Sequence, residues 1–325
     1  MMSYKRPPFN LTPLIFQKCQ KIAFALGVLE GSKLDAFNIT LRRANQVKSI
    51  QSSLAIEGNQ LSIEQVTGLL EGKRVIGPQQ DIIEVNNAIQ IYSNLKKWDP
   101  CSIESLQAAH QLLMQNLIPN NGHWRTQGIG IFKGKKVAHV APPASRVPLL
   151  MGNLFFFLNN EIDIPWLIKA CVFHYELEFI HPFSDGNGRI GRLWQQILLM
   201  KEHRIFQYIS VESIIKDKQA NYYNVLAQSD STGDATLFLE FSLEQILCTL
   251  NDYLEQPLLN KKMDNEIRLQ YVESSLKNKW FTRKDYLFLH KTIAPATASR
   301  DLERGVKLKI LIKRGDKKIT EYRFQ

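Results

Sequence analysis

Residues 164–180, IPWLIKACVFHYELEFI, are the part of this chain that most restricts how it can fold. They are apolar almost all the way round a helix, and a helix without a polar face has to be enclosed by other helices. Residues 102–117 show helical spacing too, with Leu106, Ala109, His110, Leu113 and Leu117 on one face. The sequence therefore predicts a mainly α-helical bundle, in which His110 is a buried core residue rather than a ligand.

Length, composition and cysteine usage exclude several classes of protein. The chain has 325 residues, 44% hydrophobic and 22% charged, which is ordinary for a globular chain of two or three domains. No window reaches the roughly 18 uninterrupted apolar residues that span a bilayer, and the chain does not begin with a secretory signal pattern. Cys19, Cys101, Cys171 and Cys248 are too scattered for a disulfide framework or a structural zinc site. We expect a cytoplasmic protein without a membrane segment.

The clearest exception to helix is GIGIFKGKKVAHVAPP, residues 128–143. Two short runs with β-branched residues flank Lys133, Gly134 and Lys135, and the pattern stops at two prolines. This pattern predicts a β-hairpin. A lone hairpin in a helical domain either caps the core or leaves an edge with which an extended segment can pair.

The chain beyond residue 256 has a different pattern and most of the excess charge. Its order of helix, helix and hairpin is typical of a winged helix, whose second helix we expect to begin near Ala294 to Thr297, with Thr297 and Ser299 near its start and Arg300 and Arg304 along one side. Residues 261–325 hold 17 Lys/Arg against 8 Asp/Glu, a surplus of nine out of the net +10. Such a surplus attracts DNA, although a solvated basic face explains it as well.

The segment HPFSDGNGRIGR, residues 181–192, follows the apolar helix directly. Pro182 disfavours helical geometry at His181 and so ends the helix there. Gly186 and Gly188 permit a tight loop with exposed backbone N–H groups, and a helical pattern resumes at once. Exposed N–H groups at a helix start attract anions, so the segment predicts an anion site.

The charged residues of this segment suggest which anion it binds. Arg189 and Arg192 lie three apart on one helical face, where two cations beside a helix N-terminus repel unless an anion of several charges lies between them. A polyphosphate fits this description. Asp185 is then an oxygen ligand for Mg²⁺ beside the phosphates, and His181 can accept a proton from an attacking hydroxyl.

Three other interpretations of this segment explain its residues less well. The string GNGRIG matches the dinucleotide-binding pattern GxGxxG, but that pattern needs a preceding strand and here a helix precedes it. His174, Glu178 and His181 share a helical face that could hold a transition metal, but the apolar neighbours favour a polar network in the core. A plain glycine turn leaves Asp185 and the arginines unexplained.

The segment resembles the Fic-domain signature HPFx(D/E)GNGRxxR, with every fixed position filled. The resemblance implies a helical-bundle transferase that moves AMP from ATP, with Mg²⁺, onto a Ser, Thr or Tyr hydroxyl of a protein and releases pyrophosphate. It implies these roles: His181 as general base, Asp185 as Mg²⁺ ligand, Asn187 with the backbone of Gly186 and Gly188 on the α-phosphate, and Arg189 and Arg192 on the outer phosphates.

The resemblance extends to two further segments. The hairpin looks like the family's flap, which pairs with a target segment; the corresponding residues are Ile131, Phe132, Lys133, Gly134, Lys135, Lys136 and Val137. In residues 219–230, Tyr222, Tyr223 and Asp230 fall where the family lines its adenine and ribose pocket, although the two tyrosines could equally be core.

SSLAIEGN, residues 52–59, resembles the family's inhibitory motif (S/T)xxxE(G/N), filled by Ser53, Glu57 and Gly58. The run from about residue 45 to 57 is predicted to be a helix closed by Gly58, and a carboxylate at the C-terminal end of a helix is best explained by a nearby cation. The resemblance implies that this cation is Arg192, and that the chain belongs to the class with an N-terminal inhibitory helix.

These inferences together predict three regions and one leading function. The regions are an N-terminal helical part (1–100), a Fic core (101–255) and a winged helix (256–325). The leading hypothesis is a self-inhibited protein adenylyltransferase whose partners are ATP, a target protein (the chain itself is one candidate) and, through residues 256–325, DNA; the family also suggests a homodimer. The alternatives are a Fic-fold enzyme that removes AMP or transfers another nucleotide, and a DNA-binding regulator with a nucleotide-sensing core.

Overall fold

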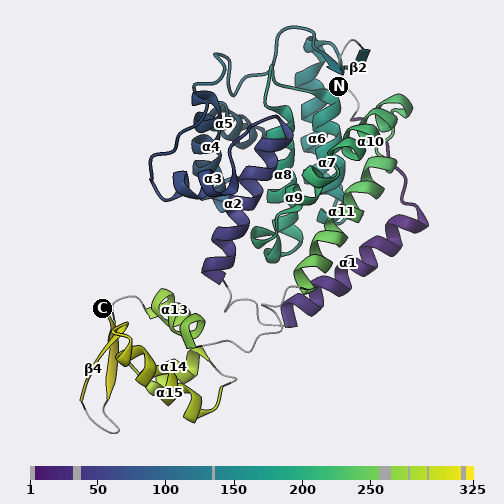
Figure 1. Ribbon diagram of the computed structural model, residues 1–325. Helices are drawn as coiled ribbons and strands as arrows, with labels where there is room; N and C mark the ends of the chain where they lie inside the picture. Colours follow the sequence, from purple (N-terminus) through teal and green to yellow (C-terminus); the bar gives the residue numbers. More distant parts are fainter. Residues whose placement is uncertain are drawn as a thin grey trace. The chain divides into compact units, whose positions relative to one another are not determined.

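The computed structural model describes residues 4–31, 38–133, 136–255, 265–276, 279–290, 293–315 and 320–325. The chain forms two compact units (Figure 1). The larger contains residues 1–28 and 42–254, and the smaller contains residues 29–41 and 255–325. The predicted division of the larger unit at residue 100 stays a prediction.

The larger unit is helical, as the sequence predicts. Its helices are α1 (Pro13–Gly31), α2 (Asn38–Ile56), α3 (Ile63–Leu70), α4 (Gln79–Tyr92), α5 (Ile103–Leu113), α6 (Val147–Asn160), α7 (Trp166–Ile180), α8 (Asn187–Glu202), α9 (Val211–Asp217), α10 (Gln219–Thr232) and α11 (Thr236–Glu255), with short 3₁₀ turns at Leu95–Lys97, Ala144–Arg146 and Arg204–Tyr208. No helix in the described ranges combines the length and the apolar character needed to cross a bilayer.

Helix α7 is enclosed by the rest of this unit (Figure 1), which confirms the prediction from its all-round apolar sequence. Eleven of its fifteen residues are buried. It packs against α8, and the two helices approach closely at Gly191, where an added Cβ would lie 3.2 Å from His174 Cδ2. The helix end that carries His181 therefore rests on a rigid core.

The predicted hairpin is present. Strands β1 (Gly130–Lys133) and β2 (Lys136–Val140) pair antiparallel, with a register shift between Ile131 and Phe132. Gly134 and Lys135 of the predicted flap lie outside the described residues. The described sheet has these two strands only, so each keeps one edge without a strand neighbour in the described part of the chain.

The smaller unit places three helices beside a small sheet. Its elements are α13 (Asn265–Leu276), β3 (Phe281–Thr282), α14 (Arg283–Leu289), α15 (Pro295–Lys307), β4 (Leu311–Arg314) and β5 (Glu321–Phe324), with strand order β3-β5-β4. Apolar side chains from all of these elements form one core, for example Val272, Leu302 and Phe324. Helix α15 begins at Pro295, which confirms the predicted start.

Candidate active site

His181 is the C-cap of α7 and has a left-handed backbone, with φ 49° and ψ 60°. Its N–H still donates to Leu177 O at 2.9 Å, so the helix ends at this residue. A left-handed conformation is uncommon for a residue other than glycine, and one before proline normally takes an extended form. The backbone that carries the imidazole is therefore strained and must be held by its surroundings.

The loop after His181 is fixed by its own side chains. The Asn187 amide accepts from Phe183 N and donates to Phe183 O, both at 2.9 Å. Gly186 has φ 81°, and an added Cβ would lie 2.6 Å from Met114 Sδ, so only glycine fits there. Asn187 thus closes the loop in this structure, a contact that the sequence analysis did not anticipate.

His110 lies beneath this loop, stacked on Phe183 with the ring centroids 3.6 Å apart. Gly122 N–H donates to its Nδ1, so the ring proton is on Nε2, which lies 2.9 Å from Asp185 O. Burial lowers the pKa of His110 to about 4, which keeps the imidazole neutral. The prediction of a buried core histidine is confirmed; its contact with the loop depends on packing and was not visible in the sequence.

Glu57 and Arg192 form an ion pair at the start of α8. Glu57 follows the last residue of α2, and its Oε1 accepts from Arg192 Nη2 at 2.6 Å. Ser53 accepts from Arg192 Nε through its Oγ at 3.1 Å and from Nη2 through its backbone O at 2.9 Å. Arg192 is only 2% exposed, and although burial opposes its charge, the Glu57 carboxylate helps to raise its pKa. The Glu57–Arg192 pair is thus present as the resemblance implied, and the contacts of Ser53 with Arg192 were not anticipated.

Glu57 also lies against the loop itself. A Cβ added at Gly188 would be only 2.4 Å from Glu57 Oε1 and 3.0 Å from Arg192 Nη1. Gly188 is in the first turn of α8, where backbone N–H groups and the helix dipole favour an anion. The Glu57 carboxylate therefore lies where the sequence predicts a bound anion.

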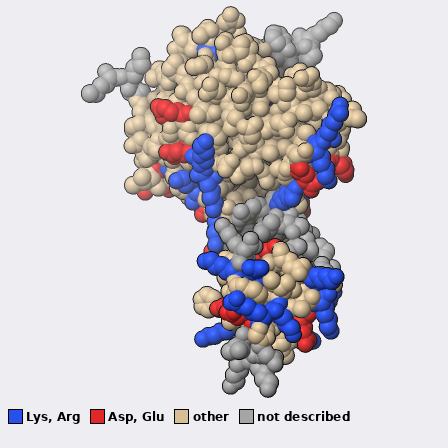
Figure 2. Space-filling view, turned by 90° about the vertical axis from the view of Figure 1, so that its left-hand side faces the viewer, with Lys and Arg blue, Asp and Glu red and all other residues tan. Residues whose placement is uncertain are grey.

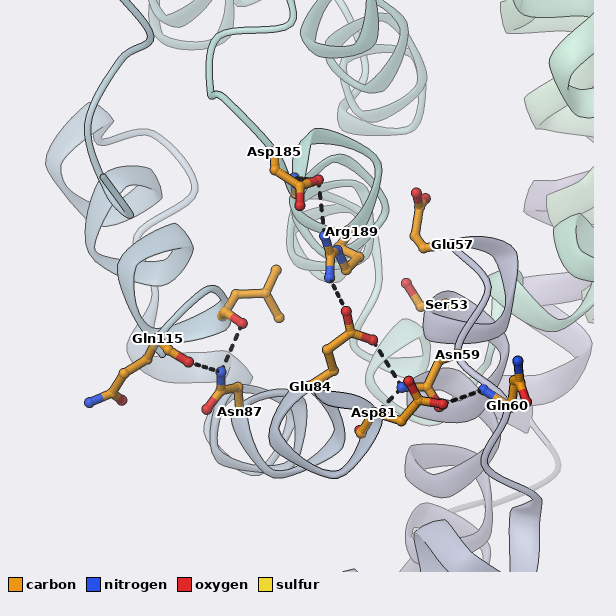
Figure 3. A network of polar contacts seen from close by, with 12 residues as sticks. Ser53, Glu57, Asn59, Gln60, Asp81, Glu84, Asn87, Gln115, Asp185 and Arg189 are labelled. Atoms are coloured by element: carbon orange, nitrogen blue, oxygen red, sulfur yellow. Dashed lines mark hydrogen bonds and ion pairs between the residues drawn. The ribbon is translucent and has the colours of Figure 1, made fainter. Parts of the chain in front are cut away.

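Arg189 has a different carboxylate partner, which the sequence analysis missed. Its Nη1 donates to Glu84 Oε1 at 2.7 Å and its Nη2 donates to Asp185 Oδ1 at 3.1 Å (Figure 3). The Arg189 side chain is 7% exposed and that of Glu84 11%, so the pair is nearly buried. The sequence signal that could have identified Glu84 is its position between two apolar residues of α4, Ile83 and Val85.

The turn that follows Glu57 is bonded to the same part of α4 (Figure 3). Asn59 Nδ2 donates to Glu84 Oε2 at 2.9 Å and to Asp81 O at 3.2 Å. Gln60 N donates to Asp81 Oδ2 at 2.8 Å. Glu84 thus contacts both Arg189 and the turn that carries Glu57.

The face of α7 with His174 and Glu178 forms a buried polar network. His174 Nδ1 lies 2.8 Å from Gln195 Oε1, and its Nε2 lies 3.1 Å from Tyr222 OH. Tyr222 OH also donates to Glu178 Oε1 at 3.4 Å. The interpretation as a core network is confirmed, and no cluster of three His, Cys, Asp or Glu in the described residues could hold a metal ion.

The residues expected to line the nucleoside pocket differ in exposure. Tyr222 is 1% exposed and belongs to the core, whereas Tyr223 is 38% exposed. Asp230 is half-buried on the same helix, α10. Of the two tyrosines, only Tyr223 therefore offers ring surface to a ligand.

Asp185 is the residue expected to bind Mg²⁺. Its side chain is 58% exposed, and its contacts with Arg189 and Gly186 N both use Oδ1. Mg²⁺ is commonly held by one or two carboxylates together with phosphate oxygens. A single accessible carboxylate beside an anion site fits an ion that binds with the nucleotide.

Comparison with known proteins gives one family. The model of the Fic/DOC family matches residues 100–199. The crystal structure of a Fic family protein from Desulfovibrio desulfuricans G20 is similar over 99% of this chain and 98% of that one, with a TM-score of 0.74 and 36% identity. Fic-1 from C. elegans (residues 134–508) has a TM-score of 0.61 at 21% identity, which is a likeness of fold alone.

Curated relatives share sequence as well. Protein adenylyltransferase Fic of Culex quinquefasciatus is 30% identical over 239 residues, and that of Aedes aegypti is 29% identical over 239 residues. Each match covers 69% of this chain and 45% of the relative. The chain thus spans about half the length of these relatives.

Proposed function

This chain belongs to the Fic family, and from that premise we propose that it is a self-inhibited protein adenylyltransferase, which transfers AMP from ATP to a Ser, Thr or Tyr hydroxyl of a protein. The observation that carries the proposal is the position of Glu57. Its carboxylate lies against Gly188 and pairs with Arg192. It therefore fills the space at the start of α8 and binds the arginine that a triphosphate would use.

The proposed reaction uses the residues of the loop. The hydroxyl oxygen attacks the α-phosphorus, the bond to the bridging oxygen of the β-phosphate breaks, and pyrophosphate leaves, while His181 accepts the hydroxyl proton. Arg189 and Arg192 neutralise the outer phosphates, and the loop N–H groups beside Asn187 face the α-phosphate. Asp185 would hold Mg²⁺, and the ion would supply further neutralisation of the phosphate charge.

The hairpin and α10 supply the two binding surfaces of the proposed enzyme. A target segment pairs by backbone hydrogen bonds with a strand edge of the hairpin, which brings its hydroxyl towards His181. Tyr223 and Asp230 contact the nucleoside. Backbone pairing depends little on the side chains of the target segment. This chain itself is therefore one candidate target.

The test is transfer of labelled AMP from ATP with Mg²⁺, with self-labelling as the readout. Three proteins are compared: the parent, Glu57→Gly, and Glu57→Gly with His181→Ala. We expect Glu57→Gly to label at least about tenfold faster than the parent, since a competing ion pair is removed, and the double variant not to label. Equal labelling of parent and Glu57→Gly would contradict self-inhibition.

Two neighbouring activities would give other outcomes. If the enzyme removes AMP, Glu57 positions the attacking water, and Glu57→Gly slows release of AMP from a modified protein. If it transfers another nucleotide, none of the three proteins labels with ATP, and calorimetry with UTP and GTP identifies the ligand.

A second function follows from the smaller unit, which we propose to be a winged helix that binds DNA. On the face shown in Figure 2, Lys and Arg side chains gather on this unit, in the lower body of that view. Arg300, Arg304 and Lys307 of α15 are all exposed. Binding to duplex DNA should weaken steeply with salt, and Arg300→Ala with Arg304→Ala should reduce that slope. Binding that is absent or independent of salt would exclude this function.

A further inference from the structure

Arg125 lies between α5 and the hairpin and is 5% exposed. In the described structure its side chain donates to four backbone carbonyls: His181 O from Nε at 2.7 Å, Gln127 O from Nη1 at 2.8 Å, and Pro142 O and Ile180 O from Nη2 at 2.5 and 3.2 Å. Its own N–H donates to Pro182 O at 2.9 Å. A buried cation held by carbonyls is costly unless it satisfies groups that would otherwise stay unpaired.

The first group of carbonyls belongs to the end of α7. The last carbonyls of a helix lack intrahelical partners and carry partial negative charge, so a cation there is favourable. Arg125 satisfies Ile180 O, His181 O and, through its backbone, Pro182 O. These three carbonyls belong to His181 and its two chain neighbours. The left-handed backbone of His181 is strained and must be fixed by its surroundings.

The second group belongs to the root of the hairpin. Gln127 precedes β1 and Pro142 follows β2, and the backbone carbonyls of both accept from the same guanidinium. Nearby, Ala141 N donates to Ile129 O at 3.2 Å and closes the hairpin. One side chain therefore joins the helix end that carries His181 to both ends of the hairpin.

We propose that Arg125 is a positioning residue for AMP transfer. It fixes the position of the hairpin root relative to the His181 backbone. A target strand paired with the hairpin then presents its hydroxyl to the imidazole. The proposal rests on the proposed adenylyltransferase function. Its hydrogen bonds reach the end of α7 and both ends of the hairpin, so it acts on the base and the target rather than on ATP.

Lysine is the informative replacement. A lysine keeps the charge but has one nitrogen, which cannot reach two separate groups of carbonyls as a guanidinium does. In the Glu57→Gly background we expect Arg125→Lys to lower kcat for transfer at least about tenfold and to change KM for ATP less than about twofold, because only the target geometry is altered. Unchanged kcat, or a rise in KM that accounts for the whole loss, would overturn the proposal.

Lys169 provides the matched control for loss of a buried cation. It is 3% exposed and donates to Leu158 O at 2.8 Å, on the far end of α7 from His181. In the same background, Lys169→Met should lower Tm and keep kcat per folded molecule. If Lys169→Met reduced kcat as much as Arg125→Lys, the effect would be general destabilisation and not positioning.

A second measurement does not depend on any AMP transfer. Hydrogen exchange of the full chain with and without Arg125→Lys should show faster exchange in residues 128–142 and 180–183, with α8 unchanged. If Glu57→Gly fails to label but this exchange pattern appears, the proposed function is wrong, while Arg125 still holds the two segments. Unchanged exchange in both segments would show that Arg125 does not hold them, whatever the activity.

Discussion

Glu84 Oε1 lies 2.7 Å from Arg189 Nη1, so each of the two site arginines is paired with a carboxylate from before residue 100. Arg192 has Glu57 from the end of α2, and Arg189 has Glu84 from α4. The family match covers residues 100–199, yet both partners lie outside it. The preceding helices therefore complete the site.

The Glu84 pair should affect nucleotide binding. Glu84 fixes a nearly buried guanidinium, so in the Glu57→Gly background Glu84→Gln should raise the ATP concentration for half-maximal transfer about tenfold, equivalent to roughly 1.4 kcal/mol. Asp81→Asn is the control, because the Asp81 carboxylate accepts from Gln60 N and, among the described residues, makes no hydrogen bond to Arg189. An unchanged KM in Glu84→Gln would show that Arg189 is held without its partner.

Ser53→Ala should activate the enzyme partially. Ser53 Oγ accepts from Arg192 Nε at 3.1 Å, and its removal loosens the contact between α2 and the arginine while Glu57 remains. Loss of one hydrogen bond to a charged group is worth about 1.5–3 kcal/mol, so we expect self-labelling above the parent and below Glu57→Gly. Ser52→Ala on the same turn is the control. Labelling equal to that of the parent would show that Glu57 alone restrains Arg192.

Acid should destabilise the loop through His110. Its pKa is lowered from 6.5 to about 4 in the folded chain, so between these values the unfolded state binds a proton that the folded state does not. Its contribution to stability is therefore complete above pH 6.5 and is lost as the pH falls towards 4, by roughly 3 kcal/mol in total. The free energy of unfolding against pH should have a smaller slope in His110→Gln than in the parent. Parallel curves would contradict this prediction.

The smaller unit should depend on one buried ion pair. Arg268 Nη2 donates to Asp301 Oδ1 at 2.7 Å, and Tyr286 OH donates to Asp301 Oδ2 at 3.1 Å. Asp301→Ala removes the carboxylate partner of a buried guanidinium, which costs about 3–5 kcal/mol, so amide exchange in residues 279–325 should accelerate.

The matched control for this prediction is an exposed pair. Arg314 Nη2 lies 2.7 Å from Glu321 Oε2, and the two side chains are 57% and 35% exposed. Glu321→Ala should therefore change the free energy of unfolding by under about 1 kcal/mol. If Asp301→Ala behaved like Glu321→Ala, the buried pair would not stabilise this unit.

Where the governing physics is local, the sequence by itself was sufficient. The glycine and proline positions predicted the loop after His181, the hairpin and the start of α15, and these are confirmed. Helical period placed Arg189 and Arg192 on one face, because residues three apart face the same way. The motif resemblance also named Glu57 as the partner of Arg192, and the pair is present.

Tertiary structure alone decided the remaining contacts. Glu84 and Arg189 are 105 positions apart, and Arg125 and His181 are 56 apart. Helical period shows which face a residue occupies, but it does not show which other element that face meets. That choice depends on the close packing of α4, α7, α8 and the hairpin in three dimensions. Packing also buries Tyr222 in the core and leaves Tyr223 exposed. The sequence thus determined the chemistry of the loop, and packing determined which residues hold it.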